Sequence, residues 1–364
     1  AETYRQKGDL GRAISLYEET ISRFPDNGVS RNGLAETYRQ QGDLVRAISL
    51  YEEVVSRFPD NAVPRNGLAE TYRQKGDLGR AISLYEEAIS RFPDDAVPRN
   101  GLAETYRQKG DLGRAVSFYE ETVSRFPDDV YARNGLAEAY RQQGDLGRAA
   151  SLYKEIVSGS PNDVVARCGL AETYRQKGDL GRAISLYEET ISRFPDDVVP
   201  RNGLSSILIA QKRFDKAREL LALESYQTES EWISFHILAF SYVREGKLSR
   251  GLRLLAHGLN SVPFPRHKKY FASALAVAKL RAGSYQEALN ILKLDDYRPG
   301  GREAVEERVL EAHARAALGQ TKQASQIIKA ASRFMSPIHC QVSDDLSTRF
   351  LLNEKDGIPS DEIH

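Results

Sequence analysis

The sequence is poor in the residues that build disulfide frameworks and membrane spans. Its 364 residues include two cysteines, Cys168 and Cys340, which lie far apart and suit a reducing compartment. No apolar run approaches the length needed to cross a bilayer, and no signal peptide is visible. We therefore expect a cytoplasmic protein with no membrane partner.

An excess of charge of either sign is also lacking. Lys and Arg number 51, as do Asp and Glu, so the formal net charge is zero and neither nucleic acid nor an anionic membrane is favoured as a partner. The sequence has no phosphate-binding loop, no G-x-S-x-G motif and no metal-spaced set of Cys and His, and all six histidines follow residue 235. We expect no enzyme, no cofactor and no bound metal.

What the sequence has instead is one 34-residue segment repeated almost unchanged. The segment Asn66–Arg99 recurs with few changes up to about residue 203, and a diverged pattern keeps the same phase beyond it. A fixed period of this size indicates stacked supersecondary units, each burying its apolar face against its neighbours. We expect near-identical repeats at 1–203, with the first truncated, divergent repeats at 204–338, and a C-terminal capping helix and tail at 339–364.

Each repeat is predicted to form two helices. The first, over about residues 64–74, has an apolar stripe of Leu68, Ala69 and Tyr72 and ends at Gly76. The second helix, over about residues 78–91, has a buried face predicted to consist of Leu78, Ala81, Ile82, Tyr85, Ala88 and Ile89.

This pattern resembles the tetratricopeptide repeat family. The positions that carry the resemblance are Leu68, Ala69, Tyr72, Gly76, Ala81, Tyr85, Ala88 and Pro93, and the match recurs in six consecutive units. The chain departs from the family at Arg65, where an aromatic residue is usual, and at Gly67, which precedes Leu68 where the family often has Gly after it. The resemblance implies an all-α, right-handed superhelical solenoid of about ten helix-turn-helix repeats. We expect the glycine column to allow close approach of helices; its members are Gly33, Gly67, Gly101, Gly135, Gly169 and Gly203.

In this family the first helices line the concave side of the superhelix, which directs attention to three polar columns. Asn66, Glu70 and Arg73 lie at spacings that share one helix surface, and their counterparts recur in neighbouring repeats. The candidate partner-binding strip comprises Asn32, Glu36, Arg39, Asn66, Glu70, Arg73, Asn100, Glu104, Arg107, Asn134, Glu138, Arg141, Glu172 and Arg175. An amide that both donates and accepts suits an extended peptide backbone. In the alternative, Asn caps or bridges adjacent helices while Glu and Arg pair on a solvated face.

The same columns become apolar after residue 203. Phe240, Val243, Val277 and Leu280 are expected to form an apolar inner face. A partner could dock there, the tail beyond residue 338 could cover it, or the C-terminal units could bury these residues against one another.

The function expected from these features is protein–protein interaction. We expect a scaffold or sensor arm that binds a partner protein or an extended peptide on its concave face. Because Ala1 falls in the middle of a repeat, the chain is expected to be part of a larger multidomain protein. The alternatives are a structural spacer or a module that self-associates through its C-terminal repeats, and an RNA-binding helical repeat, which the zero net charge disfavours.

Overall fold

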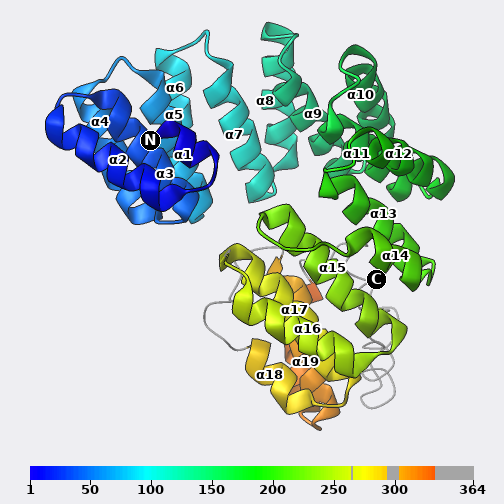
Figure 1. Ribbon diagram of the computed structural model, residues 1–364. Helices are drawn as coiled ribbons and strands as arrows, with labels where there is room; N and C mark the ends of the chain where they lie inside the picture. The colour runs from blue at the N-terminus through cyan, green and yellow to red at the C-terminus, as the bar shows by residue number, and fades with distance from the viewer. Residues whose placement is uncertain (264, 293–302, 333–364) are drawn as a thin grey trace. The chain divides into compact units, whose positions relative to one another are not determined.

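The computed structural model describes residues 1–263, 265–292 and 303–332 of the chain (Figure 1). Within these ranges every regular element is an α-helix, and the helices alternate as first and second members of successive pairs. The first helices are α1 (Glu2–Gln6), α3 (Gly28–Gln41), α5 (Ala62–Lys75), α7 (Ala96–Lys109), α9 (Val130–Gln143), α11 (Val164–Gln176), α13 (Val198–Ala210), α15 (Glu229–Glu245), α17 (Pro265–Arg281) and α19 (Glu303–Ala317). The second helices are α2 (Leu10–Arg23), α4 (Leu44–Arg57), α6 (Leu78–Arg91), α8 (Leu112–Arg125), α10 (Leu146–Gly159), α12 (Leu180–Arg193), α14 (Phe214–Leu221), α16 (Leu248–Ser261), α18 (Tyr285–Leu292) and α20 (Thr321–Ser332). The predicted all-α repeat architecture is confirmed, whereas the tail predicted at 339–364 lies outside the described residues.

Side-chain capping contacts set where the first helices α3 to α15 begin. Asn61 precedes α5, and its side chain accepts a hydrogen bond from the backbone N–H of Val63 at 3.0 Å. Pro64 lies in the first turn, where its missing N–H leaves no hydrogen bond unmade.

A glycine in the left-handed region sets the turn between the two helices of a pair. Gly76 has a φ of +87°, and its N–H donates to the carbonyls of Tyr72 and Arg73 at the end of α5. Asp77 then caps α6 by accepting from the backbone N–H of Arg80 at 3.1 Å. The Gly-Asp pair therefore ends one helix and starts the next, as the sequence predicted.

Small residues let the two helices of a pair pack closely. Ala69 on α5 and Ala81 on α6 are fully buried, and Leu68, Tyr72 and Tyr85 are buried beside them. Each large side chain removed from water in this way contributes roughly 1.5–3 kcal/mol. From α1 to α11 and from α13 to α20 each helix packs against its neighbours in sequence, and successive first helices from α3 to α11 and from α13 to α19 also contact each other.

The chain divides into two compact units, and the division falls inside α12. Unit 1 is Ala1–Leu186 and unit 2 begins at Tyr187. Unit 1 consists of near-identical pairs whose helices, apart from α1, are 13 or 14 residues long. Unit 2 is less regular, since α14 and α18 have 8 residues while α15 and α17 have 17. This division does not coincide with residue 203, where the repeats become less similar in sequence. The domain boundary predicted at residue 203 stays a prediction.

Candidate interaction surface on the first helices

The candidate strip lies on α3, α5, α7, α9 and α11, and its acidic and basic members bind one another. Arg73 holds Glu70 through two parallel hydrogen bonds, from Nε at 2.8 Å and from Nη2 at 2.5 Å. Arg107 holds Glu104 in the same fork, at 2.7 and 2.5 Å. A bidentate guanidinium–carboxylate pair is stronger and more directional than a single hydrogen bond. The same pair recurs in each of the five helices; its other members are Arg39 with Glu36, Arg141 with Glu138, and Arg175 with Glu172.

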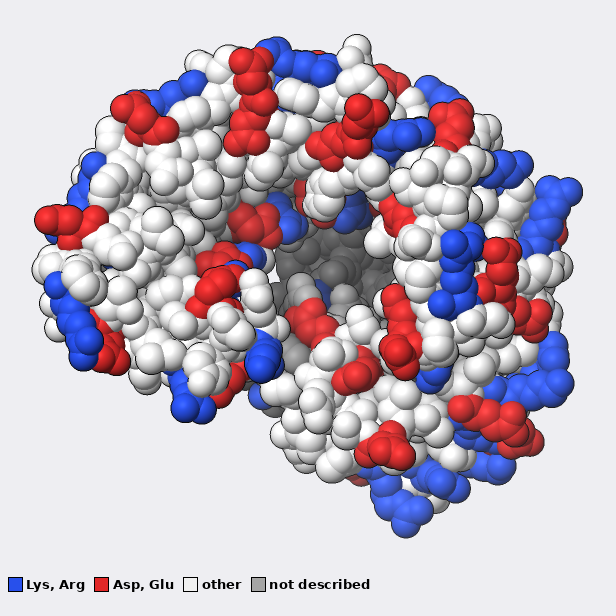
Figure 2. Space-filling model, turned by 45° about the horizontal axis from the view of Figure 1, so that its top comes forward, with Lys and Arg blue, Asp and Glu red and all other residues white. Residues whose placement is uncertain are grey.

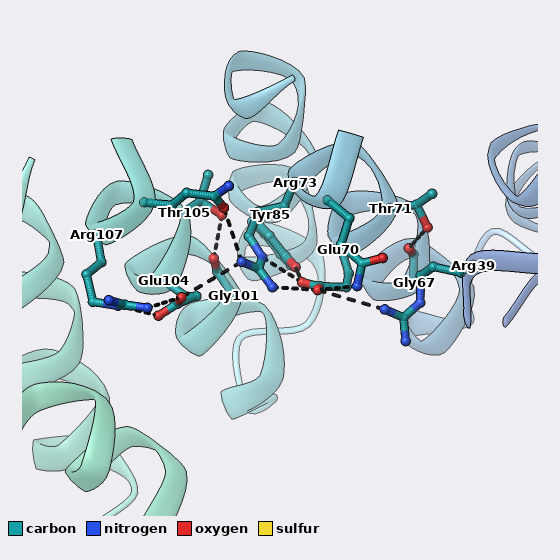
Figure 3. A network of polar contacts seen from close by, with 12 residues as sticks. Arg39, Gly67, Glu70, Thr71, Arg73, Tyr85, Gly101, Glu104, Thr105 and Arg107 are labelled. Atoms are coloured by element: carbon teal, nitrogen blue, oxygen red, sulfur yellow. Dashed lines mark hydrogen bonds and ion pairs between the residues drawn. The ribbon is translucent and has the colours of Figure 1, made fainter. Parts of the chain in front are cut away.

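These pairs join into a ladder that links neighbouring repeats (Figure 3). The second Nη of Arg73 lies 3.8 Å from the Glu104 carboxylate of the following repeat, and that of Arg39 lies 3.9 Å from Glu70. Arg141 approaches Glu172 in the same way, at 3.7 Å. We call this series of alternating carboxylates and guanidinium groups the Arg–Glu ladder. The ladder fixes the relative position of adjoining first helices, and each of its Arg–Glu pairs has no net charge.

Tyrosines of the second helices α4, α6, α8 and α10 donate hydrogen bonds to the carboxylates of the ladder. The hydroxyl of Tyr85 on α6 donates to Glu70 at 3.2 Å, and that of Tyr51 on α4 donates to Glu36 at 2.8 Å. To reach Glu70, Tyr85 crosses the surface of α7 at Gly101, where an added Cβ would lie 2.3 Å from the ring. The sequence predicted close approach of helices at the glycine column; what lies against these glycines is a tyrosine ring of the preceding second helix.

The electrostatics of the ladder stabilise its ionised form. Partial burial raises the pKa of the Glu70 carboxyl, but the hydrogen bonds and positive charge of Arg73 outweigh burial, so the net pKa lies below its usual 4.5. The pKa values of Glu36 and Glu138 are lowered by the same balance. Burial, followed by the charge of Glu70, raises the pKa of the Tyr85 phenol, which therefore remains a hydrogen-bond donor.

The asparagine column bridges neighbouring repeats through its amide groups. Nδ2 of Asn100 donates to the Asp129 carboxylate at 2.8 Å, and Asp129 is the N-cap residue of α9. Asn66 donates to Asp95 at 3.1 Å and Asn134 to Asp163 at 2.8 Å in the same way. The amide oxygens of these three residues are buried and have no hydrogen-bond partner. The same is true of the amide oxygen of Asn32. Bridging of adjacent helices was one of the two roles that the sequence left open.

The predicted apolar face of unit 2 is largely internal. Val243 on α15 and Leu280 on α17 are buried in two core clusters, and only Phe240 and Val277 keep part of their surface. Val243 is enclosed because α16 brings Gly251 against it, where an added Cβ would lie 2.5 Å from Val243 Cγ2. Two of the four residues thus offer no surface to a partner.

Two further columns of residues, each repeated every 34 positions, were not predicted from the sequence as structural or functional features. The first is a series of buried arginines at the position where the family usually has an aromatic residue. Arg99 is buried, and its Nη1 donates to Glu121 of the paired helix at 2.5 Å. Arg65 donates to Glu87 at 2.6 Å and to the Pro59 carbonyl at 3.3 Å. The signal was the recurrence of Arg at the position where the family usually has an aromatic residue.

The second column is apolar and exposed. It holds the second residue of five successive first helices, namely Val29, Val63, Val97, Tyr131 and Val165. We call these five residues the valine column. An apolar residue retained every 34 positions at an exposed helix start was a signal available in the sequence.

Other kinds of site find little support in the described part of the chain. Within it, no group of three or more His, Cys, Asp or Glu side chains is placed to hold a metal ion. No helix in the described ranges combines the length and apolar character needed to cross a membrane. Basic and acidic side chains alternate over the visible surface, without a large field of one sign (Figure 2).

Pairs of antiparallel helices, stacked in sequence order with one surface repeated from pair to pair, define a helical-repeat protein. Family models described as tetratricopeptide repeat match residues 28–94, 61–128, 100–164 and 174–236, which together span more than half of the chain. The chain belongs to the tetratricopeptide repeat family. Repeats of this family build protein–protein interaction scaffolds, and that is the general class of function the fold supports.

Solved structures share the fold at low sequence identity. A tetratricopeptide repeat protein from Parabacteroides merdae aligns with a TM-score of 0.54 and 18% identity, over 72% of this chain and 98% of its own. The human IFIT1 dimer with m7Gppp-AAAA aligns with a TM-score of 0.53 and 15% identity, over 91% of this chain and 79% of that one. The APC/C hetero-tetramer Cut9-Hcn1 aligns with a TM-score of 0.51 and 15% identity, over 86% of this chain and 58% of that one. No curated protein matches the chain.

Proposed function

We propose that unit 1 binds an extended segment of a partner protein along the surface formed by its first helices. The observation that supports this proposal is the repetition of one surface, in fixed register, on α3, α5, α7, α9 and α11. A partner segment that crosses these helices meets the same side chains at each one. A surface of this kind suits a ligand that is itself regular and extended.

The state of the strip's charges disfavours a nucleic-acid ligand. A phosphate-binding site needs guanidinium or ammonium groups that are free to replace counterions. Arg73 is instead held by Glu70 in its own helix and approaches Glu104 in the next repeat. The capped RNA seen with the structurally similar IFIT1 therefore has no counterpart in the chemistry of this strip.

The proposal can be tested with a phage-displayed library of random 16-residue peptides panned against the full chain. We expect wild-type protein to enrich a defined set of peptides whose binding is then measured by fluorescence anisotropy. The double variant Glu104→Gln with Arg107→Gln should weaken binding, because it loosens the surface without changing its net charge. Arg80→Gln with Glu86→Gln, which alters two exposed residues of α6 and also leaves the net charge unchanged, is the matched control.

Two results would contradict the proposal. Failure to enrich any peptide would leave the spacer role as the better account of unit 1. Peptides that bind both double variants as tightly as wild type would place the binding surface elsewhere. Circular dichroism of each variant separates loss of binding from loss of fold.

A further inference from the structure

Among the described residues of unit 1, the exposed large apolar side chains of the first helices are those of the valine column. Its five residues are between 57% and 83% exposed. The residues before them vary between Gly, Ala and Val, and those after them between Ser, Pro and Ala, yet the column itself stays apolar.

The column runs beside the Arg–Glu ladder. Val63 and Glu70 are seven residues apart, which is close to two full helical turns, so they lie on the same side of α5. Tyr131 on α9 supports this placement. Partial burial raises the pKa of its phenol, and so do the nearby carboxylates of Glu104 and Glu70.

The ladder itself has few free groups to offer a ligand. Glu70 already accepts from Arg73, Tyr85 and Gln74, and Arg73 also approaches Glu104. A ligand that took over any of these bonds would first have to break a bond of equal kind. The anchoring contacts are therefore better sought in the valine column, with the ladder holding the helices in register.

The helix caps beside the last three members of the column are acidic, whereas Asn27 and Asn61, which cap α3 and α5, are neutral. Asp95, Asp129 and Asp163 cap the helices that carry Val97, Tyr131 and Val165. In the described part of the chain these carboxylates accept only from neutral donors, which are backbone N–H groups and asparagine amides. The positive end of a helix offsets about half an elementary charge. Each cap therefore retains part of its negative charge beside an exposed apolar side chain.

The spacing of the helices suits one backbone conformation. A single guanidinium, that of Arg73, reaches carboxylates on both α5 and α7, so these helices lie in direct contact at the usual separation of about 8–10 Å. A polyproline II helix has three residues per turn and a rise of about 3.1 Å per residue, so one of its faces repeats about every 9.3 Å. Every third side chain of such a segment can therefore meet successive members of the column.

We propose that the valine column binds a polyproline II-like segment of a partner protein that carries an apolar side chain at every third position and Lys or Arg between them. This inference rests on the proposed function, since it names the class of peptide that the first helices take. The apolar side chains pack on Val63, Val97 and Tyr131. The basic side chains lie near the acidic helix caps.

Three synthetic peptides test the proposal with the full chain. The peptide (Leu-Pro-Lys)5 has the required spacing and charge, (Leu-Pro-Glu)5 keeps the spacing and reverses the charge, and a scrambled (Leu-Pro-Lys)5 keeps the composition and removes the spacing. We expect the first to bind and the other two to bind at least about tenfold more weakly, which corresponds to about 1.4 kcal/mol. Binding of the first should also weaken between 50 and 300 mM NaCl (concentrations chosen for the assay), because it depends on opposite charges.

A set of matched variants then assigns the contact. The triple variant Val63→Ser, Val97→Ser and Tyr131→Ser should lose binding of (Leu-Pro-Lys)5 by at least about tenfold. Val45→Ser is the control, because Val45 is equally exposed but begins a second helix. All four positions are exposed, so the fold should survive, and thermal unfolding confirms it.

The outcomes separate the inference from the proposed function. If the phage library enriches peptides that lack the three-residue pattern and bind the triple variant normally, the inference is wrong and the proposed function stands. Equal binding of the ordered and scrambled peptides overturns the spacing argument in the same way. If neither the library nor (Leu-Pro-Lys)5 yields binding, both proposals fail.

Discussion

Tyr85 occupies the space that a side chain at position 101 would need, since a Cβ added to Gly101 would lie 2.3 Å from its ring. The tyrosine can reach Glu70 only across a helix surface that lacks a side chain. Gly is a poor helix former, costing about 1 kcal/mol relative to Ala. Its recurrence at this position therefore reflects a packing requirement that outweighs helix propensity.

We predict that Gly101→Ala destabilises unit 1 by about 1–3 kcal/mol, because overpacking against Tyr85 exceeds the gain in helix propensity. The measurement is local hydrogen exchange in α6 and α7, together with urea-induced unfolding. Gly113→Ala is the control, since the nearest atom to a Cβ there is Asp111 Oδ1 at 3.8 Å, and it should be neutral or stabilising. Equal stability of the two variants would show that the ring moves aside freely.

The second prediction concerns acid. The carboxyl groups of Glu36, Glu70 and Glu138 have folded-state pKa values below their usual 4.5, and the pKa of Glu2 is lowered to about 2, chiefly by its hydrogen bond to Arg5. A depressed pKa contributes stability above the unfolded value and loses it as the pH falls through the folded value. Unit 1 should therefore keep constant stability from pH 8 to about 5 and lose it progressively below about 4.5.

Glu70→Gln tests the assignment of this acid transition to the ladder. It should cost about 1–3 kcal/mol at pH 7, as expected for a lost hydrogen bond to a charged group, and should flatten the pH dependence. Glu86→Gln, an exposed position on α6, is the control and should change neither. An acid transition of full amplitude in Glu70→Gln would place its origin outside the ladder.

Much of this arrangement follows from the sequence. The remainder depends on which residue of another helix each side chain contacts. The period, the Gly-Asp turn and the alanine positions of the core are local properties, so Gly76, Ala69 and Ala81 could be placed before the fold was known. The partner of Asn66 could not, because Asp95 lies 29 residues away and nothing in helix spacing states how adjoining pairs are offset. The burial of Val243 was hidden for the same reason, since it depends on Gly251 of another helix.

The third prediction separates a bridging asparagine from a ligand-binding one. In Asn66→Asp the new carboxylate would face that of Asp95, at a position where the amide nitrogen now lies 3.1 Å away. Two like charges at that distance destabilise the fold by roughly 2–4 kcal/mol at neutral pH and raise the pKa of the pair. A raised pKa contributes stability at low pH and loses it as the pH rises, so the stability difference between this variant and wild type should shrink towards pH 4.

Thermal unfolding of Asn66→Asp and Asn66→Ala at pH 4 and pH 7 checks this prediction. The alanine variant should be only mildly destabilised, by about 0.5–1.5 kcal/mol, and this difference from wild type should not shrink in the same way at low pH. If the aspartate variant is as stable as the alanine variant at pH 7, the bridge to Asp95 is absent in solution and the amide is free for a ligand.

The fourth prediction contrasts two arginines with similar ion pairs and different burial. Arg99 contacts Glu121 at 2.5 Å and is buried, whereas Arg91 contacts Asp60 at 3.0 Å on an exposed surface. Arg99→Ala should cost about 2–4 kcal/mol, because the packing of its buried aliphatic part is lost along with its hydrogen bond to Glu121. Arg91→Ala should cost less than about 1 kcal/mol, and less still at high salt.

Urea-induced unfolding at 50 and 500 mM NaCl (assay conditions) measures both effects. The loss in Arg99→Ala should depend little on salt, because most of it comes from the packing of the buried arginine, whereas its partner Glu121 is 57% exposed. Equal losses for the two arginines would mean that the position where the family usually has an aromatic residue does not contribute to the core.

The last prediction concerns Lys212, which stands 34 residues after Gly178 and takes the place of a glycine that ends the first helix of most other repeats. Its φ is +59°, and it is the one non-glycine residue with positive φ in the described part of the chain. The left-handed conformation costs an L-residue with a Cβ roughly 1–2 kcal/mol, which glycine avoids at the price of greater freedom in the unfolded chain. Lys212→Gly should therefore stabilise the α13–α14 pair by about 1 kcal/mol net.

The reciprocal Gly178→Lys, at a φ of +81° in unit 1, should destabilise by a similar amount or more. Slower hydrogen exchange in α14 in the first variant, and faster exchange in α11 in the second, would support a shared turn geometry. No change in either would mean that the turn after α13 relaxes to another conformation in solution.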